Sequence, residues 1–442
     1  MKNNKKIYIE TYGCQMNVSD SEIVASILYE NGYEQTTEVP VADIVLINTC
    51  SIRENAEERV RKRLLYFKSL RKRKPDLIIG LLGCMADRTK TALMEEEQLL
   101  DLVAGPDSYR HLPQLLAQVG TGQKAIDTIL SVDETYADIT PVRIDSNGVS
   151  AFISIMRGCE NYCSYCVVPS TRGQERSRDA DSIVRETLDL FEKGYREITL
   201  LGQNVNSYEW KTGEQTINFA QLLEKVAGVS PMMRIRFATS HPKDISDKLL
   251  HVIARNPNLC KAIHLPVQSG SNHMLDLMNR KYTREEYMDR IRSIRQIIPG
   301  CAISTDIIAG FCDETDADHM DTLSLMEWAE YDAAFMFKYS ERPQTLAADT
   351  LKDNVPEKIK ERRLTEIIGL QQKLSLANNL NEIGKTVEIL VEGRSKRSEN
   401  QYFGRSSQNK VAVFTKTDAG PGEYVNVKIT GATSATLLGE VV

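Results

Sequence analysis

The sequence lacks a long apolar run, an internal repeat and any segment of low complexity. No stretch of its 442 residues approaches the roughly 18 consecutive apolar residues of a membrane-spanning helix. The N-terminal residues 1–6 are basic, but they lead straight into the strand-like segment Ile7–Ile9 and not into an apolar signal core. We therefore expect a cytoplasmic protein without a membrane partner.

An overall positive field is also missing. The chain has 55 Lys and Arg against 61 Asp and Glu, which gives a net charge of −6. A nucleic-acid partner would therefore have to be held by local basic patches. The hydrophobic content of 41% is ordinary for a folded protein, and the length suggests roughly two to four domains.

The nine cysteines are the most informative residues that are present. In a reducing compartment, metal-binding or catalytic roles outrank disulfides. Cys159, Cys163 and Cys166 form a C-x3-C-x2-C segment directly after the apolar run 151–156. Three thiolates do not complete a structural zinc site, but they can hold three irons of a [4Fe-4S] cluster and leave the fourth iron open to a small molecule. A zinc knuckle with a fourth ligand elsewhere is the alternative. The position of the loop after the first strand of a barrel-like series disfavours it.

The neighbours of these cysteines fit a cofactor loop. Gly158 is expected to let the backbone come close to a cluster. Tyr165 is suited to stack on a planar ligand ring.

A second set of cysteines follows three predicted strands in residues 1–119. The strands are Lys6–Thr11, Asp43–Asn48 and Leu77–Leu82, and Cys14, Cys50 and Cys84 come just after their ends. Strands that alternate with helices form a parallel sheet, whose carboxyl ends share one edge. We therefore expect these cysteines to converge as a second three-cysteine site. Three unrelated buried cysteines are the alternative, because free Cys is often simply core.

The rest of the chain predicts two further domains, so the fold class is α/β with a small β-domain. Residues 120–147 are polar and are expected to form a linker. Residues 148–377 show six strand–helix units, typical of a (βα)6 partial barrel. The expected strands are 152–156, 197–201, 234–237, 262–265, 302–308 and 333–337, and the expected helices are 180–193, 219–226, 244–254, 274–279, 284–297 and 318–329. Period-two patterns in residues 378–442 predict a small antiparallel β-barrel.

The cysteine loop resembles the signature loop of radical S-adenosylmethionine (SAM) enzymes. In that superfamily the open iron binds SAM, and reductive cleavage of SAM gives a 5′-deoxyadenosyl radical. Three N-terminal cysteines, a radical SAM core and a C-terminal barrel together resemble the methylthiotransferases. Within that family, the sequence most resembles the branch that acts on N6-isopentenyladenosine in tRNA. The residues that carry this resemblance are 158–173, 201–208, 237–242 and 264–271.

The resemblance implies two [4Fe-4S] clusters and two SAM molecules per turnover. Cys159, Cys163 and Cys166 would hold the SAM-cleaving cluster, and Cys14, Cys50 and Cys84 an auxiliary cluster that carries the sulfur. One SAM would methylate that sulfur, and the other would activate C2 of the adenine. An external electron donor such as flavodoxin or ferredoxin is expected, and the protein is expected to be a monomer.

Residues after the other barrel strands are candidates for SAM contacts. They are Gly202, Gln203, Asn204, Ser240, His241, Gln268 and Asp306. For 202–204 an ordinary turn is the alternative, and a lone His such as His241 is often structural. Arg172, Arg176 and Arg178 are expected to meet phosphate or the SAM carboxylate, or else to be solvated. Cys312 stands where the family usually has Pro, so we interpret it, like Cys260 and Cys301, as a bystander.

RNA contact is predicted from two basic segments. Ten Lys or Arg stand between residues 53 and 74: Arg53, Arg59, Arg61, Lys62, Arg63, Lys68, Arg71, Lys72, Arg73 and Lys74. This pattern suits phosphate binding, although many charge runs are solvated helix faces. The C-terminal region resembles the RNA-binding TRAM domain, with Arg394, Lys396, Arg397 and Arg405 beside Tyr402 and Phe403.

The predicted function is therefore methylthiolation of N6-isopentenyladenosine 3′ of the anticodon, with the tRNA anticodon stem-loop as partner. Two related activities remain as alternatives: methylthiolation of N6-threonylcarbamoyladenosine in tRNA, and of an aspartate of a ribosomal protein. A non-enzymatic Fe–S protein would need four cysteines per cluster, which this sequence does not offer.

Overall fold

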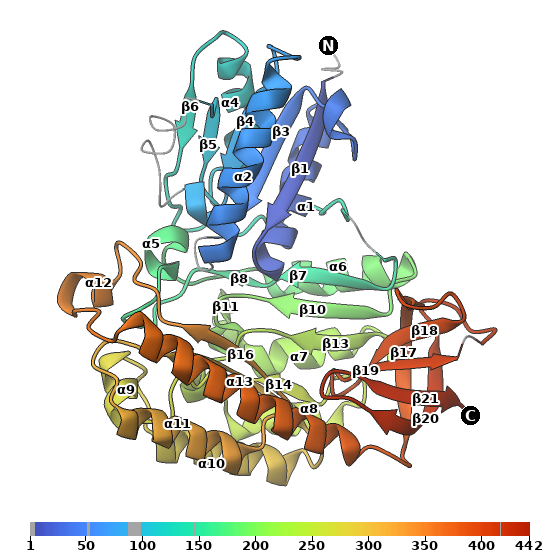
Figure 1. The fold of residues 1–442 in the computed structure, drawn as a ribbon. Helices are drawn as coiled ribbons and strands as arrows, with labels where there is room; N and C mark the ends of the chain where they lie inside the picture. Colours follow the sequence, from blue (N-terminus) through green and yellow to red (C-terminus); the bar gives the residue numbers. More distant parts are fainter. Residues whose placement is uncertain (1–4, 51–53, 87–98, 145–146, 416) are drawn as a thin grey trace. The chain divides into compact units, whose positions relative to one another are not determined.

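The computed structural model describes residues 5–50, 54–86, 99–144, 147–415 and 417–442, and the side chains of 54–58 are not described. The chain divides into two compact units (Figure 1). Unit 1 comprises residues 1–145, 156–160 and 166–178, and unit 2 comprises residues 146–155, 161–165 and 179–442. The cysteine loop thus contributes Cys159 and Cys166 to unit 1 and Cys163 to unit 2.

Unit 1 is built on a six-stranded sheet of order β2-β1-β3-β4-β5-β6 in which every pairing is parallel. Its strands are β1 (Lys6–Tyr12), β2 (Glu34–Gln35), β3 (Ile44–Thr49), β4 (Ile78–Leu82), β5 (Leu102–Ala104) and β6 (Ala125–Asp127). One face packs against α1 (Gln15–Glu30) and α4 (Leu112–Val119). The other face packs against α2 (Glu54–Arg71) through Val60, Leu64 and Phe67. The predicted parallel α/β sheet is confirmed.

The segment predicted as a linker is in part structural. Residues 125–127 pair with β5 as the edge strand β6, and the ring of Tyr136 is buried in the core of unit 1. The hydroxyl of Tyr136 donates to the carbonyl of Pro106 at 3.0 Å. The strand was not predicted because it has only three residues within a polar segment. Also in unit 1 are β8 (Met156–Arg157), β9 (Arg176–Ser177) and α5 (Val168–Arg172).

Unit 2 contains the six predicted parallel strands in two sheets of order β13-β10-β7 and β14-β15-β16. They are β7 (Ser150–Ser154), β10 (Glu197–Leu201), β13 (Arg234–Phe237), β14 (Ala262–His264), β15 (Ala302–Ala309) and β16 (Ala333–Lys338). A parallel bridge between Ile235 and Leu259 continues the series from β13 toward β14. The partial barrel predicted from the sequence is confirmed.

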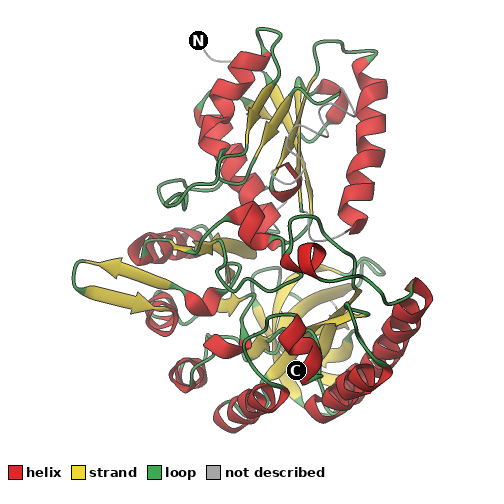
Figure 2. Ribbon diagram, turned by 90° about the vertical axis from the view of Figure 1, so that its left-hand side faces the viewer, coloured by secondary structure: helices red, strands yellow, loops and turns green. Residues whose placement is uncertain are grey.

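Helices alternate with these strands as expected. They are α6 (Ala180–Glu192), α7 (Phe219–Ala227), α8 (Asp247–Arg255), α9 (Asn272–Leu277), α10 (Arg284–Ile297), α11 (Asp316–Ala329), α12 (Leu346–Thr350) and α13 (Glu357–Leu380). The predicted start of α8 at residue 244 is wrong because Ser246 accepts a hydrogen bond from the Leu249 amide and caps the helix. A hairpin of β11 (Glu209–Thr212) and β12 (Gln215–Asn218) was not predicted, and it projects from unit 2 in Figure 2.

The C-terminal residues form a closed barrel of order β17-β18-β19-β21-β20. Its strands are β17 (Thr386–Arg394), β18 (Gln401–Ser406), β19 (Val411–Thr415), β20 (Tyr424–Ala432) and β21 (Leu437–Val441). Ion pairs join the barrel to the core of unit 2. Arg405 pairs with Glu197 at 3.1 Å, and Arg234 pairs with Glu388 at 3.1 Å. Within the described ranges, no helix combines the length and apolar character that a membrane crossing requires.

Candidate metal centres

Cys14, Cys50 and Cys84 lie where the carboxyl ends of β1, β3 and β4 meet. Gly13, before Cys14, has a φ of +134°, and a Cβ placed on it would lie 2.6 Å from the Cβ of Cys50. Gly83, before Cys84, has a φ of +85°, and a Cβ there would lie 2.8 Å from the carbonyl oxygen of Thr49. Both positions therefore require glycine, since L side chains rarely adopt such φ values. The two glycines let the turns that carry Cys14 and Cys84 close onto the end of β3.

Two buried amides that sequence reasoning missed support this site. The side-chain oxygen of Asn17 accepts hydrogen bonds from the backbone N–H of Cys14 at 3.2 Å and from its thiol at 3.3 Å. Asn17 Nδ2 donates to Asn48 Oδ1 at 3.2 Å, and Asn48 Nδ2 donates back to the Asn17 carbonyl at 2.9 Å. A hydrogen bond with Cys50 lowers the pKa of the Cys14 thiol to about 6, against the effect of burial. Cluster ligands are thiolates, so a low thiol pKa suits this role.

A buried arginine contacts the third cysteine of this site. Arg172 Nε donates to Cys84 Sγ at 3.2 Å, and its Nη2 pairs with Asp20 at 2.7 Å. Asp20 also pairs with Arg157 at 2.9 Å. Burial raises the pKa of Asp20, but Arg157 and Arg172 together hold that pKa below its usual value. All these groups belong to unit 1.

The expectation that Arg172 and Arg176 are solvated is wrong. Both are buried and used inside unit 1, where Arg176 pairs with Asp107 at 3.0 Å. Arg178 is buried as well. The interpretation failed because the carboxylates involved lie far away along the chain, so no local pattern links them to these arginines.

Gly158 has a packing role in the structure. Its φ is +78°, and a Cβ placed there would lie 1.9 Å from the carbonyl oxygen of Gln174. Beside it, the backbone N–H of Cys159 donates to the Gly173 carbonyl at 3.2 Å. The glycine is therefore needed for close packing against residues 173–174. Cys166 accepts a hydrogen bond at its Sγ from the Val168 amide, at 3.4 Å, where α5 begins.

In unit 2, residues 277–280 hold the middle of the cysteine loop. The Ser164 amide donates to the Met278 carbonyl at 3.0 Å, and the Ser164 hydroxyl donates to the Leu277 carbonyl at 2.7 Å. Arg280 Nη1 donates to Cys163 Sγ at 3.2 Å and to the Tyr165 hydroxyl at 3.3 Å. The ring of Tyr165 stands edge-on to Phe311, with centroids 6.5 Å apart.

Buried polar groups gather after β10 and β13. Gln203 Oε1, both amide atoms of Asn206, Ser240 Oγ and His241 Nε2 are buried and have no hydrogen-bond partner among the described residues. An unpaired buried polar atom costs about 1–3 kcal/mol. Such a cluster is therefore typical of a site that a polar ligand completes, and these groups fit SAM.

The other predicted SAM contacts, Gly202, Asn204, Gln268 and Asp306, have partners within the fold or lie at the ends of strands. Asn204 already has two partners in the fold: its side chain donates to Asp244 at 2.7 Å and accepts from the backbone N–H of His241 at 3.1 Å. Gly202 is buried just past the end of β10. Gln268 has a φ of +73°, and its backbone N–H donates to the backbone carbonyl of Asp306 at 2.9 Å. Asp306 faces His264 Nε2 at 3.4 Å.

His241 predicts a dependence of stability on pH. Burial, with Arg280 and Lys243 nearby, lowers the pKa of His241 to about 2. The folded state therefore excludes a proton that the unfolded state binds below pH ~6.5, so stability falls as pH decreases from there. The free energy of unfolding should lose up to about 1.4 kcal/mol per pH unit through this group.

Chemical unfolding of the parent and of His241→Asn between pH 7 and 5 measures this effect. Asn can still accept the hydrogen bond that His241 Nδ1 receives from the Lys243 amide at 3.4 Å. His319, whose pKa burial also lowers, is present in both proteins and cancels in the difference. Equal pH slopes for the two proteins would contradict the prediction.

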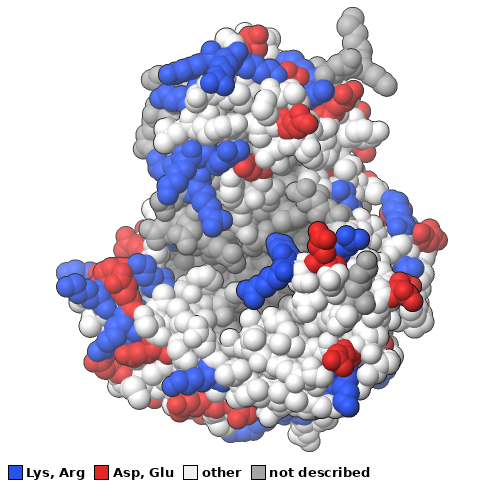
Figure 3. Space-filling view, turned by 45° about the vertical axis from the view of Figure 1, so that its right-hand side comes forward, with Lys and Arg blue, Asp and Glu red and all other residues white. Residues whose placement is uncertain are grey.

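The predicted basic segments are partly confirmed as surface features. Arg59, Arg61, Lys62, Lys68, Lys72 and Arg73 are exposed. Arg63 pairs with Glu10, Arg71 with Asp101 and Lys74 with Asp43. Arg53, with the side chains of Glu54, Glu57 and Glu58, lies outside the described residues. Figure 3 shows Lys and Arg gathered on a face of unit 1.

In the C-terminal barrel, Arg394, Lys396 and Arg397 are exposed. Tyr402, however, belongs to the barrel core, and Arg405 pairs with Glu197 and Glu392. Tyr402 therefore has a structural role in the barrel, and Arg405 forms ion pairs within unit 2.

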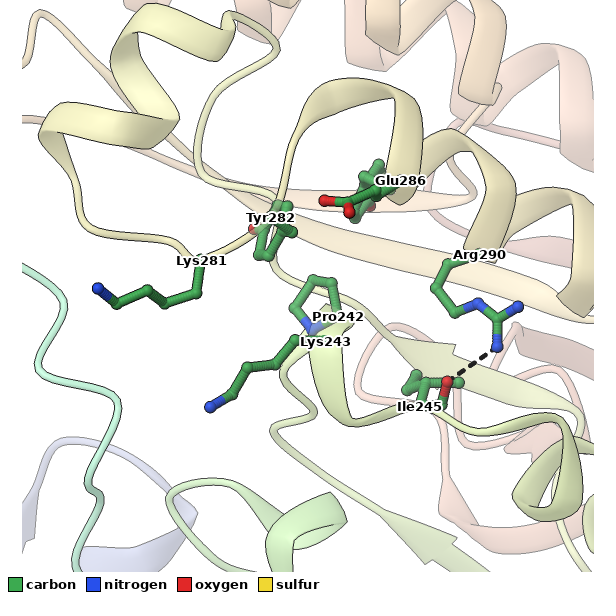
Figure 4. A pocket seen from close by; sticks show the side chains of 8 residues that line it. Pro242, Lys243, Ile245, Lys281, Tyr282, Glu286 and Arg290 are labelled. Carbon is green, nitrogen blue, oxygen red and sulfur yellow. Dashed lines mark hydrogen bonds between the residues drawn. The ribbon is translucent and has the colours of Figure 1, made fainter.

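A pocket of about 300 Å³ lies beside the loop that ends at Tyr282 (Figure 4). Lys243, Lys281 and Arg290 line it together with Glu286. The guanidinium of Arg290 is held by the Ile245 carbonyl at 2.9 Å and by Asp247 at 2.8 Å. The ammonium groups of Lys243 and Lys281 extend away from the other lining residues in Figure 4.

The donor sets fit iron–sulfur clusters better than a single ion. Among the residues that the structure describes, no three Cys, His, Asp or Glu groups are close enough to bind one metal ion together. Ligands of a cluster bind separate irons, so they need not meet at one point. All nine cysteines are free thiols, and Cys260 and Cys312 are buried. Cys312 packs in an apolar cluster with Met274 and Tyr339, so its reading as a bystander agrees with its surroundings.

Comparison with known families defines the class. Residues 6–105 match the family described as Uncharacterized protein family UPF0004, residues 153–326 match the radical SAM superfamily, and residues 381–442 match the TRAM domain. The fold and these matches define a radical SAM protein with a C-terminal TRAM barrel.

Sequence relatives define the family. The tRNA-2-methylthio-N(6)-dimethylallyladenosine synthase of Amoebophilus asiaticus is 58% identical over 99% of this chain and 92% of its own length. The protein of the same name from Bacteroides fragilis is 58% identical over 99% of this chain and 96% of its own length. The chain belongs to the family of tRNA-2-methylthio-N(6)-dimethylallyladenosine synthases.

Solved structures agree on the fold. The radical SAM methyltransferase TsrM of Kitasatospora setae superposes with a TM-score of 0.57 at 13% identity and covers 78% of this chain and 75% of its own. The cobalamin-dependent radical SAM enzyme OxsB gives a TM-score of 0.55 at 14% identity, over 84% of this chain and 56% of its own.

Proposed function

We propose that this protein converts N6-isopentenyladenosine 3′ of the anticodon in tRNA to its 2-methylthio derivative. It is a radical SAM tRNA methylthiotransferase. The observation that carries the proposal is the 58% identity, from end to end, to relatives named for this reaction. The convergent cysteines after β1, β3 and β4 support it, because a sulfur donor site is what this reaction adds to a radical SAM core.

The proposed ligands are two sets of three thiolates. Cys159, Cys163 and Cys166 would hold one [4Fe-4S] cluster, and Cys14, Cys50 and Cys84 a second. When bound, the clusters supply the electron that cleaves SAM and the site that carries the sulfur. The chain itself shapes and shields these positions: Gly13 and Gly83 bring the second set together, and buried arginines contact Cys84 and Cys163.

The barrel residues have binding roles in this proposal. The unpaired atoms of Gln203, Ser240 and His241 would contact SAM. The imidazole of His241 stays neutral at physiological pH, because burial lowers its pKa to about 2. Its Nδ1 accepts from the Lys243 amide, so its Nε2 carries the proton and is available as a donor.

The remaining parts of the proposal concern organisation and partners. Residues 1–119 would form the sulfur-donor domain, 148–377 the radical SAM domain and 378–442 the RNA-binding barrel. The protein would act in the cytoplasm as a monomer, on the anticodon stem-loop, with a flavodoxin- or ferredoxin-like electron donor. Exposed cations of α2 and of the barrel support contact with RNA phosphates.

The test is an anaerobic incubation of reconstituted protein with SAM, reductant and an isopentenylated anticodon stem-loop. We expect 2-methylthio-N6-isopentenyladenosine in the digested RNA, and no methylthio product from the same stem-loop with unmodified adenosine. A stem-loop with N6-threonylcarbamoyladenosine and a ribosomal protein serve as competing substrates. Methylthiolation of either, with the isopentenylated RNA unchanged, would overturn the assignment.

A further inference from the structure

One cysteine of each set accepts a hydrogen bond from a buried arginine. In unit 2, Arg280 Nη1 lies 3.2 Å from Cys163 Sγ. In unit 1, Arg172 Nε lies 3.2 Å from Cys84 Sγ. The two arginines are 4% and 3% exposed. The two contacts have the same donor and the same acceptor chemistry, but they differ in what surrounds the guanidinium.

Arg280 is held by neutral groups. Its Nη2 donates to the Pro266 carbonyl at 2.8 Å, and its Nε donates to the Tyr282 hydroxyl at 2.9 Å. That hydroxyl in turn lies 2.9 Å from the Val267 carbonyl. In the part of the chain that the structure describes, no carboxylate lies within ion-pair distance of Arg280. Its positive charge therefore stays uncompensated next to Cys163.

The positive charge of Arg172, in contrast, faces a carboxylate. Asp20 accepts from its Nη2 at 2.7 Å, and Asp20 is itself completely buried. Arg157 shares that carboxylate at 2.9 Å. The charge of Arg172 that reaches Cys84 is thus partly offset by a fixed negative group, which Arg172 shares with Arg157.

Net charge and hydrogen bonds to sulfur are among the factors that set the reduction potential of an iron–sulfur cluster. Reduction adds a negative charge, so a nearby buried cation stabilises the reduced form and raises the potential. The effect is largest where water and counter-charges are excluded.

We propose that Arg280 is a positioning residue that raises the reduction potential of the cluster held by Cys159, Cys163 and Cys166, whereas Arg172, partly neutralised by Asp20, orients Cys84 with a smaller effect on potential. The proposal rests on the proposed function, because that assigns the two clusters. The difference in charge would favour placing the incoming electron on the cluster that cleaves SAM.

The test uses full-length protein that can bind one cluster only. In the background Cys14→Ala, Cys50→Ala and Cys84→Ala, the midpoint potential is measured by a redox titration followed by electron paramagnetic resonance, without SAM or RNA. Arg280→Gln keeps a hydrogen-bond donor but removes the charge. We expect about a tenfold smaller ratio of reduced to oxidised cluster at a fixed poise, equivalent to about 59 mV for a one-electron couple. Arg280→Lys keeps the charge, and its shift should be clearly smaller.

Arg284→Gln is the matched control from the same segment. Arg284 donates to the Gly270 carbonyl at 2.8 Å and to Asp321 and Ser324, and contacts no sulfur. Its replacement removes local hydrogen bonds of a guanidinium in the same way but should leave the midpoint unchanged. An unchanged midpoint in Arg280→Gln, or an equal shift in Arg284→Gln, would overturn the inference.

The second arm uses the background Cys159→Ala, Cys163→Ala and Cys166→Ala. Here Arg172→Gln should lower the midpoint by less than Arg280→Gln does in its own background, and Asp20→Asn should raise it. A shift in Arg172→Gln as large as that in Arg280→Gln would refute the role given to Asp20. A shifted midpoint in Arg280→Gln together with unmodified tRNA would refute the proposed substrate and leave this inference standing.

Discussion

Replacing Cys14, Cys50 and Cys84 together by Ala is expected to abolish methylthiolation of RNA while SAM cleavage continues. The three side chains follow β1, β3 and β4 at one edge of the sheet, and Gly13 and Gly83 bring their turns to the end of β3. No acid–base chemistry of protein side chains inserts sulfur at an unactivated aromatic C–H, so the loss should be complete. Bound iron should fall from about eight to about four per chain.

Two measurements check this outcome: 5′-deoxyadenosine for SAM cleavage and the methylthio nucleoside for sulfur insertion. Cys260→Ala with Cys301→Ala is the matched control, because both thiols precede strands of unit 2 and neither belongs to the sheet of unit 1. The control should keep both products. Loss of SAM cleavage in the triple variant would mean that the two cysteine sets have been assigned to the wrong roles.

Replacing Cys159, Cys163 and Cys166 by Ala should have a larger effect, because every product is lost. SAM would no longer be cleaved, and without that step the adenine is not activated. About four irons should stay bound, now at the N-terminal site. The two triple variants thus separate the roles by product pattern: one loses a single product, the other loses both.

Iron content and the same two products are measured on this second variant. Cys312→Ala is a suitable control, since Cys312 lies in an apolar cluster with Met274 and Tyr339. It should lose stability through the small cavity but keep both products. Continued formation of 5′-deoxyadenosine in the variant without Cys159, Cys163 and Cys166 would contradict the account.

Much of the fold could be predicted because its signals are local. The strands of the partial barrel are short buried runs bounded by turns, and β10 and β13 were placed at the observed residues. Strands with mixed composition give a weaker signal: β18 alternates Tyr402, Gly404 and Ser406 on its buried face. Gly404 is needed there, since a Cβ would lie 2.0 Å from the Leu390 carbonyl oxygen. A pattern search for apolar alternation does not detect such a strand.

The positions of the cysteines at the strand ends could be predicted, but their surroundings could not. Spacing identifies Cys159, Cys163 and Cys166, and the strand ends identify the other set. The contact of Arg172 with Asp20 joins residues 152 positions apart, and that of Arg280 with Cys163 joins residues 117 positions apart. Such pairs carry no local signal. The same holds for Asn204: its position after β10 predicts a ligand contact, but no local pattern predicts that its side chain also holds the loop of His241.

The most direct test of the central claim is mass spectrometry of tRNA nucleosides from a strain that lacks its own methylthiotransferase and carries this protein. The account predicts that 2-methylthio-N6-isopentenyladenosine appears and that N6-isopentenyladenosine declines, and that the variant without Cys14, Cys50 and Cys84 leaves N6-isopentenyladenosine unchanged. Persistence of unmodified N6-isopentenyladenosine with the intact protein, alongside a methylthio group on N6-threonylcarbamoyladenosine or on a ribosomal protein, would contradict it.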